Sequence, residues 1–431
     1  MYTTNQSVCM IEGVSVRELQ ATYGTPLYIM SEPELERRLG LVRNAFLDKY
    51  PNTYALYASK AMSIAAVYDK VMAAGLSIDV VSRGEMFVAL HAGVPADRIH
   101  VHGSNKTVQD ITFALENGIT HFTIDNMREI GLLSGLAAEQ GVEDVDVLLR
   151  IVPQVVGGAH EAIQTGGVDT KFGFPTHDDA YLEAIKATLQ AERLHLRGIH
   201  CHVGSQIQEP TLFINTVKTM VAFIETIRQE TGYTADVLNI GGGFGVAYLE
   251  SDDPLDFADT MTQVMDTLVA EVNRFGLPLP KIGIEPGRWL VANAGATLYE
   301  VGTVKEVSGV RTYVSVDGGM TDNIRPALYD AEYDVIAATR MDEAKTLEAK
   351  IVGACCESGD IISNRSLIPP VEAGDLLLVK ATGAYNFSMA SNYNQMLRPA
   401  VVFVKDGTHR LVVRRQTLED LVACEIVGQS T

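Results

Sequence analysis

Helical and strand-like patterns of apolar residues alternate over residues 31–285. One helical stretch begins at Ser31, where Glu34 completes a capping box, and continues with Leu35 and Leu39 on one stripe. Strands that alternate with helices form parallel sheets, and eight such units make a (β/α)8 barrel. The pattern therefore predicts an α/β fold with such a barrel, whose eight strands are expected at residues 54–58, 76–80, 99–102, 121–125, 145–151, 196–202, 237–240 and 281–285.

The pattern changes after residue 285 to strands joined by tight turns. These features predict a C-terminal all-β domain over residues 286–431. Residues 1–30 carry no pattern that assigns them to either domain, and we expect them to join the β domain. The strands of that domain are expected at residues 297–307, 312–316, 348–353, 375–381, 400–404 and 410–414.

Composition narrows the classes of function. A chain of 431 residues with 47% hydrophobic residues can bury a large core, while its net charge of −20 argues against nucleic acid and anionic membranes as partners. The five cysteines form no CxxC pair and no zinc spacing, which indicates a reducing compartment and no metal site. The first residues show no basic start followed by an apolar segment, and no apolar run reaches the length of about 18 residues that a membrane helix needs. We therefore expect a cytoplasmic protein.

The active site of a parallel barrel forms where its strands end, so charged, polar and nucleophilic residues at those ends are candidate active-site residues. The first predicted strand leads into Lys60 in the sequence YASKA. Partial loss of solvation at a barrel mouth favours the neutral amine that Schiff-base formation needs. A surface lysine whose stem packs on apolar neighbours is the alternative interpretation.

The sixth and seventh predicted strands end in HVGSQ, which contains His202 and Ser205, and in the run GGGFG around Gly243. A histidine at a barrel mouth can lay its flat face on an aromatic ligand, although a core histidine is equally compatible with the pattern. Consecutive glycines let backbone N–H groups close around an anion such as phosphate. A tight turn is the alternative, but it needs fewer glycines.

The eighth predicted strand ends in Glu285-Pro286-Gly287-Arg288. An acidic side chain in this position can keep a pyridine nitrogen protonated, so that the ring accepts electrons. Arg288 can hold a phosphate or a carboxylate with two parallel hydrogen bonds. A structural ion pair at the domain junction is the alternative for each residue alone. Together with the lysine, the histidine and the glycines, however, they are the parts that one molecule of pyridoxal 5′-phosphate requires.

The order of the motifs YxSKA, HVGSQ, GGGFG, EPGR, CES and GAY resembles the fold-type III pyridoxal-phosphate decarboxylases, which have an alanine-racemase-like barrel and a β domain. The resemblance extends from Tyr23 to about Arg398. It implies that Lys60 is the Schiff-base lysine and that His202 stacks on the cofactor ring. It further implies a set of cofactor contacts from Ser205, Gly243, Glu285, Pro286, Gly287, Arg288 and Tyr385.

Within that family, the segments SVDGGMTDNIRPALY and CCESGD resemble the diaminopimelate decarboxylases. This resemblance implies decarboxylation of meso-2,6-diaminopimelate to L-lysine, with a second amino-acid group at the far end of the substrate. Such a pocket needs cation or hydroxyl partners for the distal carboxylate and an anion for the distal ammonium. Glu357 is the expected anion, and Cys356 is interpreted as a proton donor in preference to a small apolar residue. The expected partners of the carboxylate are Arg288, Arg325 and Tyr329, and Tyr385 is also expected to contact the substrate.

Three alternatives remain open: a decarboxylase of ornithine, lysine or carboxynorspermidine, an amino-acid racemase, and a non-catalytic carrier of the cofactor. Arg325 argues against the first, since a substrate that ends only in ammonium gains nothing from an arginine there. Glu285 argues against a racemase, and the extended β domain argues against a carrier. The family resemblance also implies a homodimer whose two active sites are each shared between the subunits. Met62 and Arg83 depart from the family pattern and leave fine specificity open. Lys171 matches a family signature, but its task is not assigned.

Overall fold

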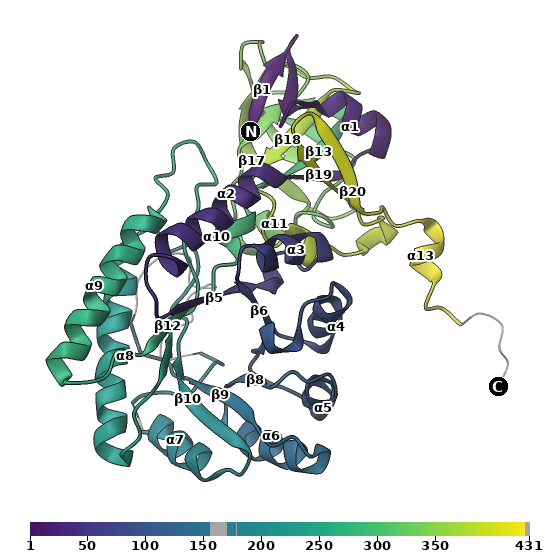
Figure 1. Ribbon diagram of the computed structural model, residues 1–431. Coiled ribbons are helices and arrows are strands. Elements are labelled where there is room, and N and C mark those ends of the chain that lie inside the picture. Colours follow the sequence, from purple (N-terminus) through teal and green to yellow (C-terminus); the bar gives the residue numbers. More distant parts are fainter. Residues whose placement is uncertain (156–169, 178, 427–431) are drawn as a thin grey trace. The chain divides into compact units, whose positions relative to one another are not determined.

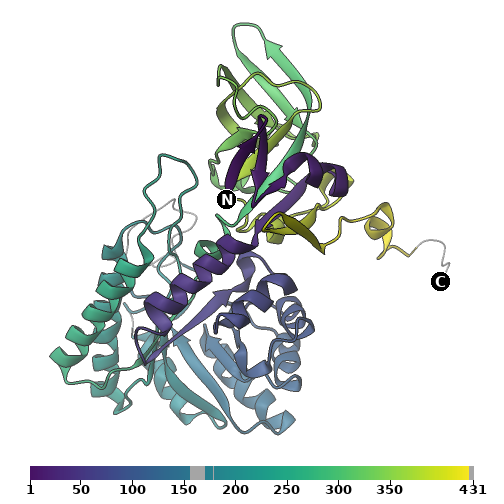
Figure 2. The ribbon, with the colours of Figure 1, turned by 45° about the horizontal axis from the view of Figure 1, so that its top comes forward.

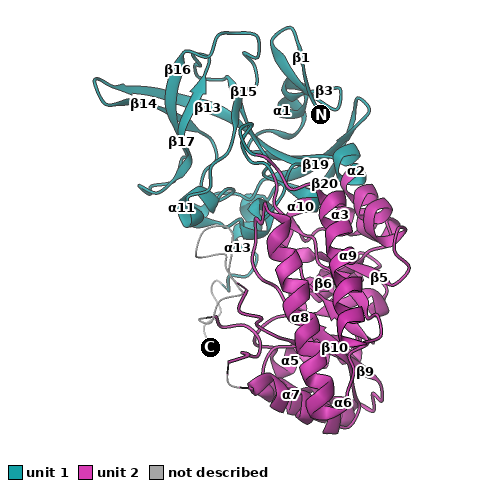
Figure 3. Cartoon of the chain, turned by 90° about the vertical axis from the view of Figure 1, so that its left-hand side faces the viewer, with its two compact units in different colours: residues 1–37, 247–252, 290–431 teal, residues 38–246, 253–289 magenta. Residues whose placement is uncertain are grey.

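The computed structural model describes residues 1–155, 170–177 and 179–426, and these residues form two compact units (Figure 3). Unit 1 comprises residues 1–37, 247–252 and 290–431, and unit 2 comprises residues 38–246 and 253–289. Unit 2 contains a closed barrel, whereas unit 1 contains two open sheets.

Eight parallel strands close the barrel of unit 2 (Figure 1). The last strand pairs with the first through Ile282 and Thr53, so the ring has no free edge. Every predicted run coincides with one of these strands to within two residues, which confirms the predicted (β/α)8 barrel. The strands are β5 (Thr53–Ala58), β6 (Ser77–Val80), β7 (Ile99–Val101), β8 (His121–Ile124), β9 (Val145–Arg150), β10 (Leu194–His200), β11 (Val237–Asn239) and β12 (Lys281–Ile284).

Helices follow the strands and bury an apolar stripe. In α8 that stripe includes Phe213, Val217 and Met220, and the helix ends at Gly232, which adopts the left-handed conformation. Helices α8 and α9 lie side by side in both views of the ribbon (Figures 1 and 2). The helices are α2 (Glu32–Val42), α3 (Ala65–Ala73), α4 (Arg83–His91), α5 (Val108–Glu116), α6 (Met127–Gln140), α7 (Ala180–Gln190), α8 (Pro210–Thr231), α9 (Phe257–Phe275) and the short α10 (Arg288–Val291).

The larger sheet of unit 1 has nine strands, and β13 lies between β4 and β14 in its order. Strand β4 (Leu27–Ser31) comes from the N-terminal segment and pairs with β13 and β19, a pairing that the sequence pattern did not assign. All six predicted β-domain strands are present. The strands after β4 are β13 (Gly295–Val307), β14 (Arg311–Val316), β15 (Val335–Ala337), β16 (Leu347–Val352), β17 (Ile361–Ile368), β18 (Leu376–Lys380), β19 (Ala400–Lys405) and β20 (Thr408–Val413).

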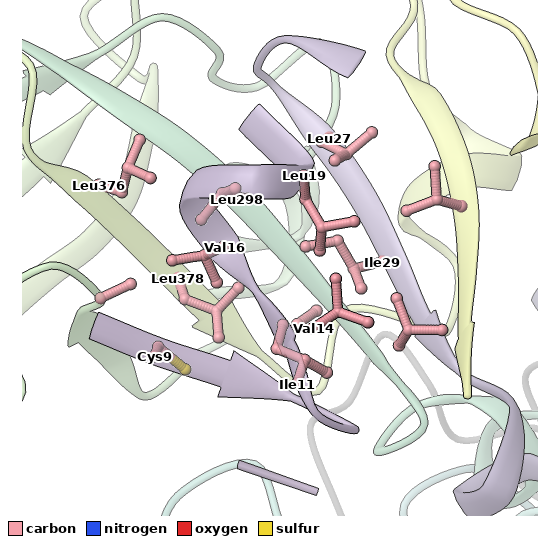
Figure 4. Close-up of a cluster of buried hydrophobic side chains, with 14 of the residues drawn as sticks. Cys9, Ile11, Val14, Val16, Leu19, Leu27, Ile29, Leu298, Leu376 and Leu378 are labelled. Atoms are coloured by element: carbon pink, nitrogen blue, oxygen red, sulfur yellow. The ribbon is translucent and has the colours of Figure 1, made fainter. Parts of the chain in front are cut away.

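The N-terminal residues also form a small sheet that contributes to the core of unit 1. Cys9, Ile11 and Val14 pack against Leu298 and Leu378 in a fully buried cluster (Figure 4). Burial of these side chains fixes the N-terminal segment in unit 1. The remaining elements of this unit are β1 (Tyr2–Asn5), β2 (Val8–Ile11), β3 (Val14–Ser15), α1 (Val16–Tyr23), α11 (Arg325–Tyr329), α12 (Asn386–Met389) and α13 (Leu418–Val422).

None of the helices within the described residues has the length and apolar character that crossing a lipid bilayer requires.

Candidate active site

Buried polar side chains gather at the carboxyl ends of the barrel strands, although the strands themselves are largely apolar. A buried polar group is costly unless it is hydrogen-bonded, so a ring of such groups marks a functional region. Of this set, only Glu285 was predicted from the sequence. The set consists of Asp79, His102, Thr123, Arg150, His200, Asn239 and Glu285.

Glu285 lies at the centre of this set and is 7% exposed. Its Oε1 accepts a hydrogen bond of 2.9 Å from Asn239 Nδ2, and its Oε2 lies 3.2 Å from His200 Nε2. His102 Nε2 lies 3.4 Å from Oε1. His102, His200 and Glu285 are also a set of donors that can hold a metal ion.

The charge of Glu285 follows from two opposing effects. Burial by itself raises the pKa of a carboxyl group, but the nearby imidazoles of His102 and His200 lower the pKa of Glu285 by more than burial raises it. Glu285 is therefore a carboxylate over the whole physiological range. Burial and the neighbouring Glu285 carboxylate raise the pKa of Asp79 well above its usual value. Glu285 thus supplies a fixed negative charge at this end of the barrel.

The glycine run after β11 packs too tightly for any side chain. A Cβ atom on Gly242 would lie 2.1 Å from the carbonyl oxygen of Glu285, and one on Gly243 would lie 2.3 Å from that of Gly204. Gly243 also has a φ of +106°, which disfavours other residues. The three strand ends are therefore joined through backbone contacts that only glycine permits.

Ser205 and Arg288 lie next to this glycine run. Gly204, which contacts Gly243, precedes Ser205, and Ser205 Oγ accepts a hydrogen bond of 3.0 Å from Arg288 Nη2. Arg288 is 5% exposed and begins α10. A guanidinium, a hydroxyl and closely packed glycine backbone form a donor set that suits a phosphate group. This chemistry and the lack of room for Cβ atoms fit the phosphate of pyridoxal 5′-phosphate.

Lys60 lies in a short 3₁₀ turn directly after β5, and its side chain is exposed within the single chain. A Cβ atom on Gly287 would lie 2.9 Å from that of Ala58 and 3.3 Å from that of Ala61, so the residues around Lys60 pack against the end of β12. Burial and the nearby Lys60 ammonium both lower the pKa of His202 well below its usual value. His202 is therefore a neutral imidazole, and its Nδ1 accepts a hydrogen bond of 3.3 Å from the Gly242 N–H. The structure thus brings Lys60, His202, the glycines and Glu285 to the same end of the barrel.

The predicted substrate residues other than Arg288 lie in unit 1, where tyrosines surround Arg325. Arg325 is 6% exposed, and its Nε donates a hydrogen bond of 2.9 Å to Tyr333 Oη. Its guanidinium carbon lies 5.3 Å from the ring centroid of Tyr329, 5.6 Å from that of Tyr385 and 5.9 Å from that of Tyr248. Among the described residues no carboxylate forms an ion pair with Arg325. Tyr248 and Tyr333 were missed by the sequence analysis, and no motif marks them.

Cys356 and Glu357 lie together in the loop between β16 and β17, and both are exposed within the single chain. Asp360 holds this loop, since its carboxylate accepts hydrogen bonds from the N–H groups of Cys355 at 2.7 Å and Met320 at 2.6 Å. Cβ atoms on Gly319 or Gly353 would lie 2.4 or 2.3 Å from the same carboxylate. The buried Asp360 therefore fixes the backbone that presents the two predicted residues.

Comparison with known proteins agrees with this geometry. Residues 16–292 match the family model of the pyridoxal-dependent decarboxylases, pyridoxal binding domain. The chain is 45% identical to the diaminopimelate decarboxylase of Bacillus subtilis (strain 168) over 416 residues, which cover 96% of this chain and 94% of that protein. It is 42% identical to the diaminopimelate decarboxylase of Staphylococcus aureus (strain COL), with 98% of each chain covered.

A solved structure shows the same architecture. The diaminopimelate decarboxylase from M. jannaschii in complex with L-lysine has a TM-score of 0.91 and 32% identity, with 99% of this chain and 98% of that chain covered. Pyridoxal 5′-phosphate is the cofactor that this similarity and the barrel residues both indicate. Since the likeness extends over almost the whole chain and includes both units, the protein belongs to the pyridoxal-dependent decarboxylases and, among them, to the diaminopimelate decarboxylase family.

Proposed function

We propose that this enzyme removes one carboxyl group of meso-2,6-diaminopimelate to give L-lysine and carbon dioxide. The observation that carries the choice of substrate is the buried guanidinium of Arg325, which has no carboxylate partner among the described residues. A buried charge without a counterion is costly, and a ligand carboxylate offsets that cost. Diaminopimelate supplies such a group at the end distant from the reacting carbon, whereas ornithine or lysine, bound by its α-amino group for decarboxylation, presents only an ammonium there.

The barrel residues hold the cofactor in this proposal. When bound, pyridoxal 5′-phosphate takes up the electron pair that remains as carbon dioxide departs. Glu285 is a carboxylate that keeps a proton on the pyridine nitrogen, and the neutral imidazole of His202 stacks on the ring. Gly243, Ser205 and Arg288 hold the phosphate, Pro286 and Gly287 shape the adjoining backbone, and Lys60 provides the amine that binds the cofactor covalently.

The residues of unit 1 bind and protonate the substrate in this proposal. Arg325 and Tyr329 hold the distal carboxylate with Arg288, and Glu357 holds the distal ammonium. Tyr385 contacts both the substrate and the cofactor. Cys356 returns a proton to the α-carbon after the carboxyl group has left, which is the role of a general acid.

We also propose that the enzyme is a homodimer and that each active site combines Lys60 of one subunit with Cys356 and Glu357 of the other. Two features support this assembly. Cys356 and Glu357 are exposed in the single chain, although catalysis requires a site that excludes water. In unit 2, large apolar side chains on and beside the N-terminal halves of α4, α5 and α6 are exposed, as in a surface that another chain covers: Val81, Phe87, Val108 and Met127.

The charge and the cysteines support two further parts of the proposal. A net charge of −20 disfavours binding of nucleic acid, so we propose that the enzyme acts without it. The cysteines lack the spacing of paired or zinc-binding residues, which supports a cytoplasmic location.

The release of carbon dioxide from several amino acids tests the proposed substrate. The purified enzyme with its cofactor is incubated with meso-diaminopimelate, lysine, ornithine and arginine in turn. We expect kcat/KM to be highest for meso-diaminopimelate. A preference for lysine or ornithine would support the alternative decarboxylase, and no release from any of the four would contradict both.

A further inference from the structure

The hydrogen bond between Arg325 Nε and Tyr333 Oη, at 2.9 Å, fixes one edge of a guanidinium that no carboxylate of the described residues contacts. From this contact we propose that Tyr333 is a positioning residue, which orients Arg325 so that its terminal N–H groups face the carboxylate of the ligand. The inference rests on the role proposed above for Arg325, and it assigns substrate selectivity to a residue that does not itself touch the substrate.

Tyr333 is suited to this task because its own position is fixed. Its ring is 3% exposed and belongs to the apolar cluster that also contains Val301 and Val379. The ring of Tyr248 packs against it edge to face, with 5.3 Å between the centroids and 88° between the planes. A hydroxyl on a ring that is held in this way occupies one position, and so defines the direction of the bond that it accepts.

The geometry of the guanidinium explains why one bond decides its orientation. A guanidinium has five N–H donors in one plane, and the Nε–H occupies one edge of that plane. When Tyr333 accepts the Nε–H, the plane can no longer turn about the side chain, and the terminal nitrogens stay available. The rings of Tyr248, Tyr329 and Tyr385 surround the same group and restrict its displacement. A carboxylate needs this fork-like arrangement to accept two parallel hydrogen bonds.

A purely structural role for the Tyr333 hydroxyl predicts a different result. If the hydroxyl only satisfied a buried donor, its removal would lower stability and affect all ligands alike. If it positions Arg325, its removal weakens only those ligands that carry a carboxylate at the Arg325 end.

Two competing ligands separate these roles. L-lysine, the product of the proposed reaction, retains the carboxylate that Arg325 would hold, while 1,5-diaminopentane has the same two amines and no carboxylate. The test is competitive inhibition of meso-diaminopimelate decarboxylation by each compound, measured on the holoenzyme and on Tyr333→Phe. We expect the inhibition constant of L-lysine to rise on the order of tenfold, as the loss of a hydrogen bond to a charged group does. The constant for 1,5-diaminopentane should change less than about twofold.

Tyr313→Phe is the matched control, because it removes the same atom from a tyrosine of β14 that is not among the contacts of Arg325. It should leave both inhibition constants unchanged. Cofactor content and the melting temperature are measured for every variant. Equal weakening of both ligands by Tyr333→Phe, or no effect on either, would overturn the proposal.

A second pair of variants keeps the two proposals apart. Arg325→Lys retains the positive charge but has no Nε–H, so Tyr333→Phe should add little to its effect on L-lysine, and a double-mutant cycle should show coupling between the two positions. Independent, additive effects would contradict the positioning role.

If Arg325→Ala itself leaves binding of L-lysine unchanged, the proposed carboxylate site has failed. If Arg325→Ala weakens L-lysine and Tyr333→Phe does not, only the positioning role has failed.

Discussion

Asn239 Nδ2 donates a hydrogen bond of 2.9 Å to Glu285 Oε1, and Asn239 Oδ1 accepts one of 2.8 Å from the Gly241 N–H. One fully buried carboxamide therefore connects Glu285 with the start of the glycine run. Nδ2 also lies 3.0 Å from the hydroxyl oxygen of Tyr54. In the proposed cofactor site, the relative placement of Glu285 and the glycine run depends on this side chain.

Asn239→Ala should weaken cofactor binding. The substitution removes a hydrogen bond to a charged group, which is worth about 1.5–3 kcal/mol, and it releases the start of the glycine run. We expect the dissociation constant of pyridoxal 5′-phosphate, measured by titration of the apoenzyme, to rise at least about tenfold. Asn52→Ala serves as the control, because the Asn52 amide donates to the carbonyl of Leu279 in an exposed position. An unchanged constant in Asn239→Ala would show that the carboxamide does not organise the site.

Borohydride treatment of the holoenzyme should attach the cofactor to a single peptide, the one that contains Lys60. The reason is that Lys60 is the lysine that follows β5 at the end of the barrel where Glu285 and the glycine run meet. Peptide mapping by mass spectrometry measures the attachment. Lys60→Ala should carry no attached cofactor after borohydride treatment. Lys49→Ala, which alters a lysine before β5, should still carry it on the Lys60 peptide. Label on another lysine would refute the assignment.

Arg325→Ala should lower kcat/KM for meso-diaminopimelate by roughly 30-fold or more, since removing one partner of a buried charged hydrogen bond costs about 2–5 kcal/mol. Activity on lysine, which has no distal carboxylate when it is bound for decarboxylation, should fall much less. Steady-state kinetics on both substrates give the comparison. Arg311→Ala, at the exposed start of β14, is the control. Equal losses of kcat/KM on both substrates would show that Arg325 does not select between them.

Mixing two inactive variants tests whether the active site is shared between subunits. Lys60→Ala and Cys356→Ala are combined under conditions that allow subunit exchange. If the residues act across the interface, each mixed dimer has one intact site and one doubly altered site. Random exchange should then restore roughly a quarter of the wild-type activity. If exchange is demonstrated and no activity returns, both residues serve a site within one chain.

Asp322 should make the stability of the fold depend on pH. Burial raises the pKa of Asp322 to about 7 in the folded protein, well above its value in the unfolded chain. Between these two pKa values the folded state binds a proton that the unfolded state does not, so stability falls as pH rises, by up to about 1.4 kcal/mol per pH unit. Above pH 7 this contribution stays constant.

Urea unfolding of the wild type and of Asp322→Asn at several pH values from 4 to 8 measures the effect. The variant retains an oxygen for the Gly319 N–H, which donates to Asp322 Oδ1 at 2.7 Å. As pH rises from 4 to 7, the free energy of unfolding of the wild type should fall relative to that of Asp322→Asn. A difference that does not vary with pH would show that Asp322 titrates normally.

The sequence predicted the barrel closely because its strands are short apolar runs between long amphipathic helices, and both patterns are local. All eight strands begin and end within two residues of the predicted positions. Among the strands after residue 285, the sequence missed β15 and β17, and the strands of the N-terminal segment were not predicted either. Strand β15 has only three residues, and in β17 polar residues such as Asn364 and Arg365 interrupt the apolar positions, so neither gives a clear period of two.

The candidate site divides in the same way. Lys60, Glu285, the glycine run and the CES loop are recognisable from residue type and place in the chain, because each follows a strand or forms a continuous motif. Asn239, His102 and Tyr333 are not, since no motif contains them and their importance arises from their partners in the fold. Asn239 and Tyr54 are 185 positions apart, and even Tyr333 and Arg325, which are only 8 apart, belong to no pattern that marks Tyr333. The sequence alone thus determined the fold class, the cofactor and the family. Only the tertiary structure decided which buried side chains fix Glu285 and Arg325, because a hydrogen bond depends on distances that the order of residues does not contain.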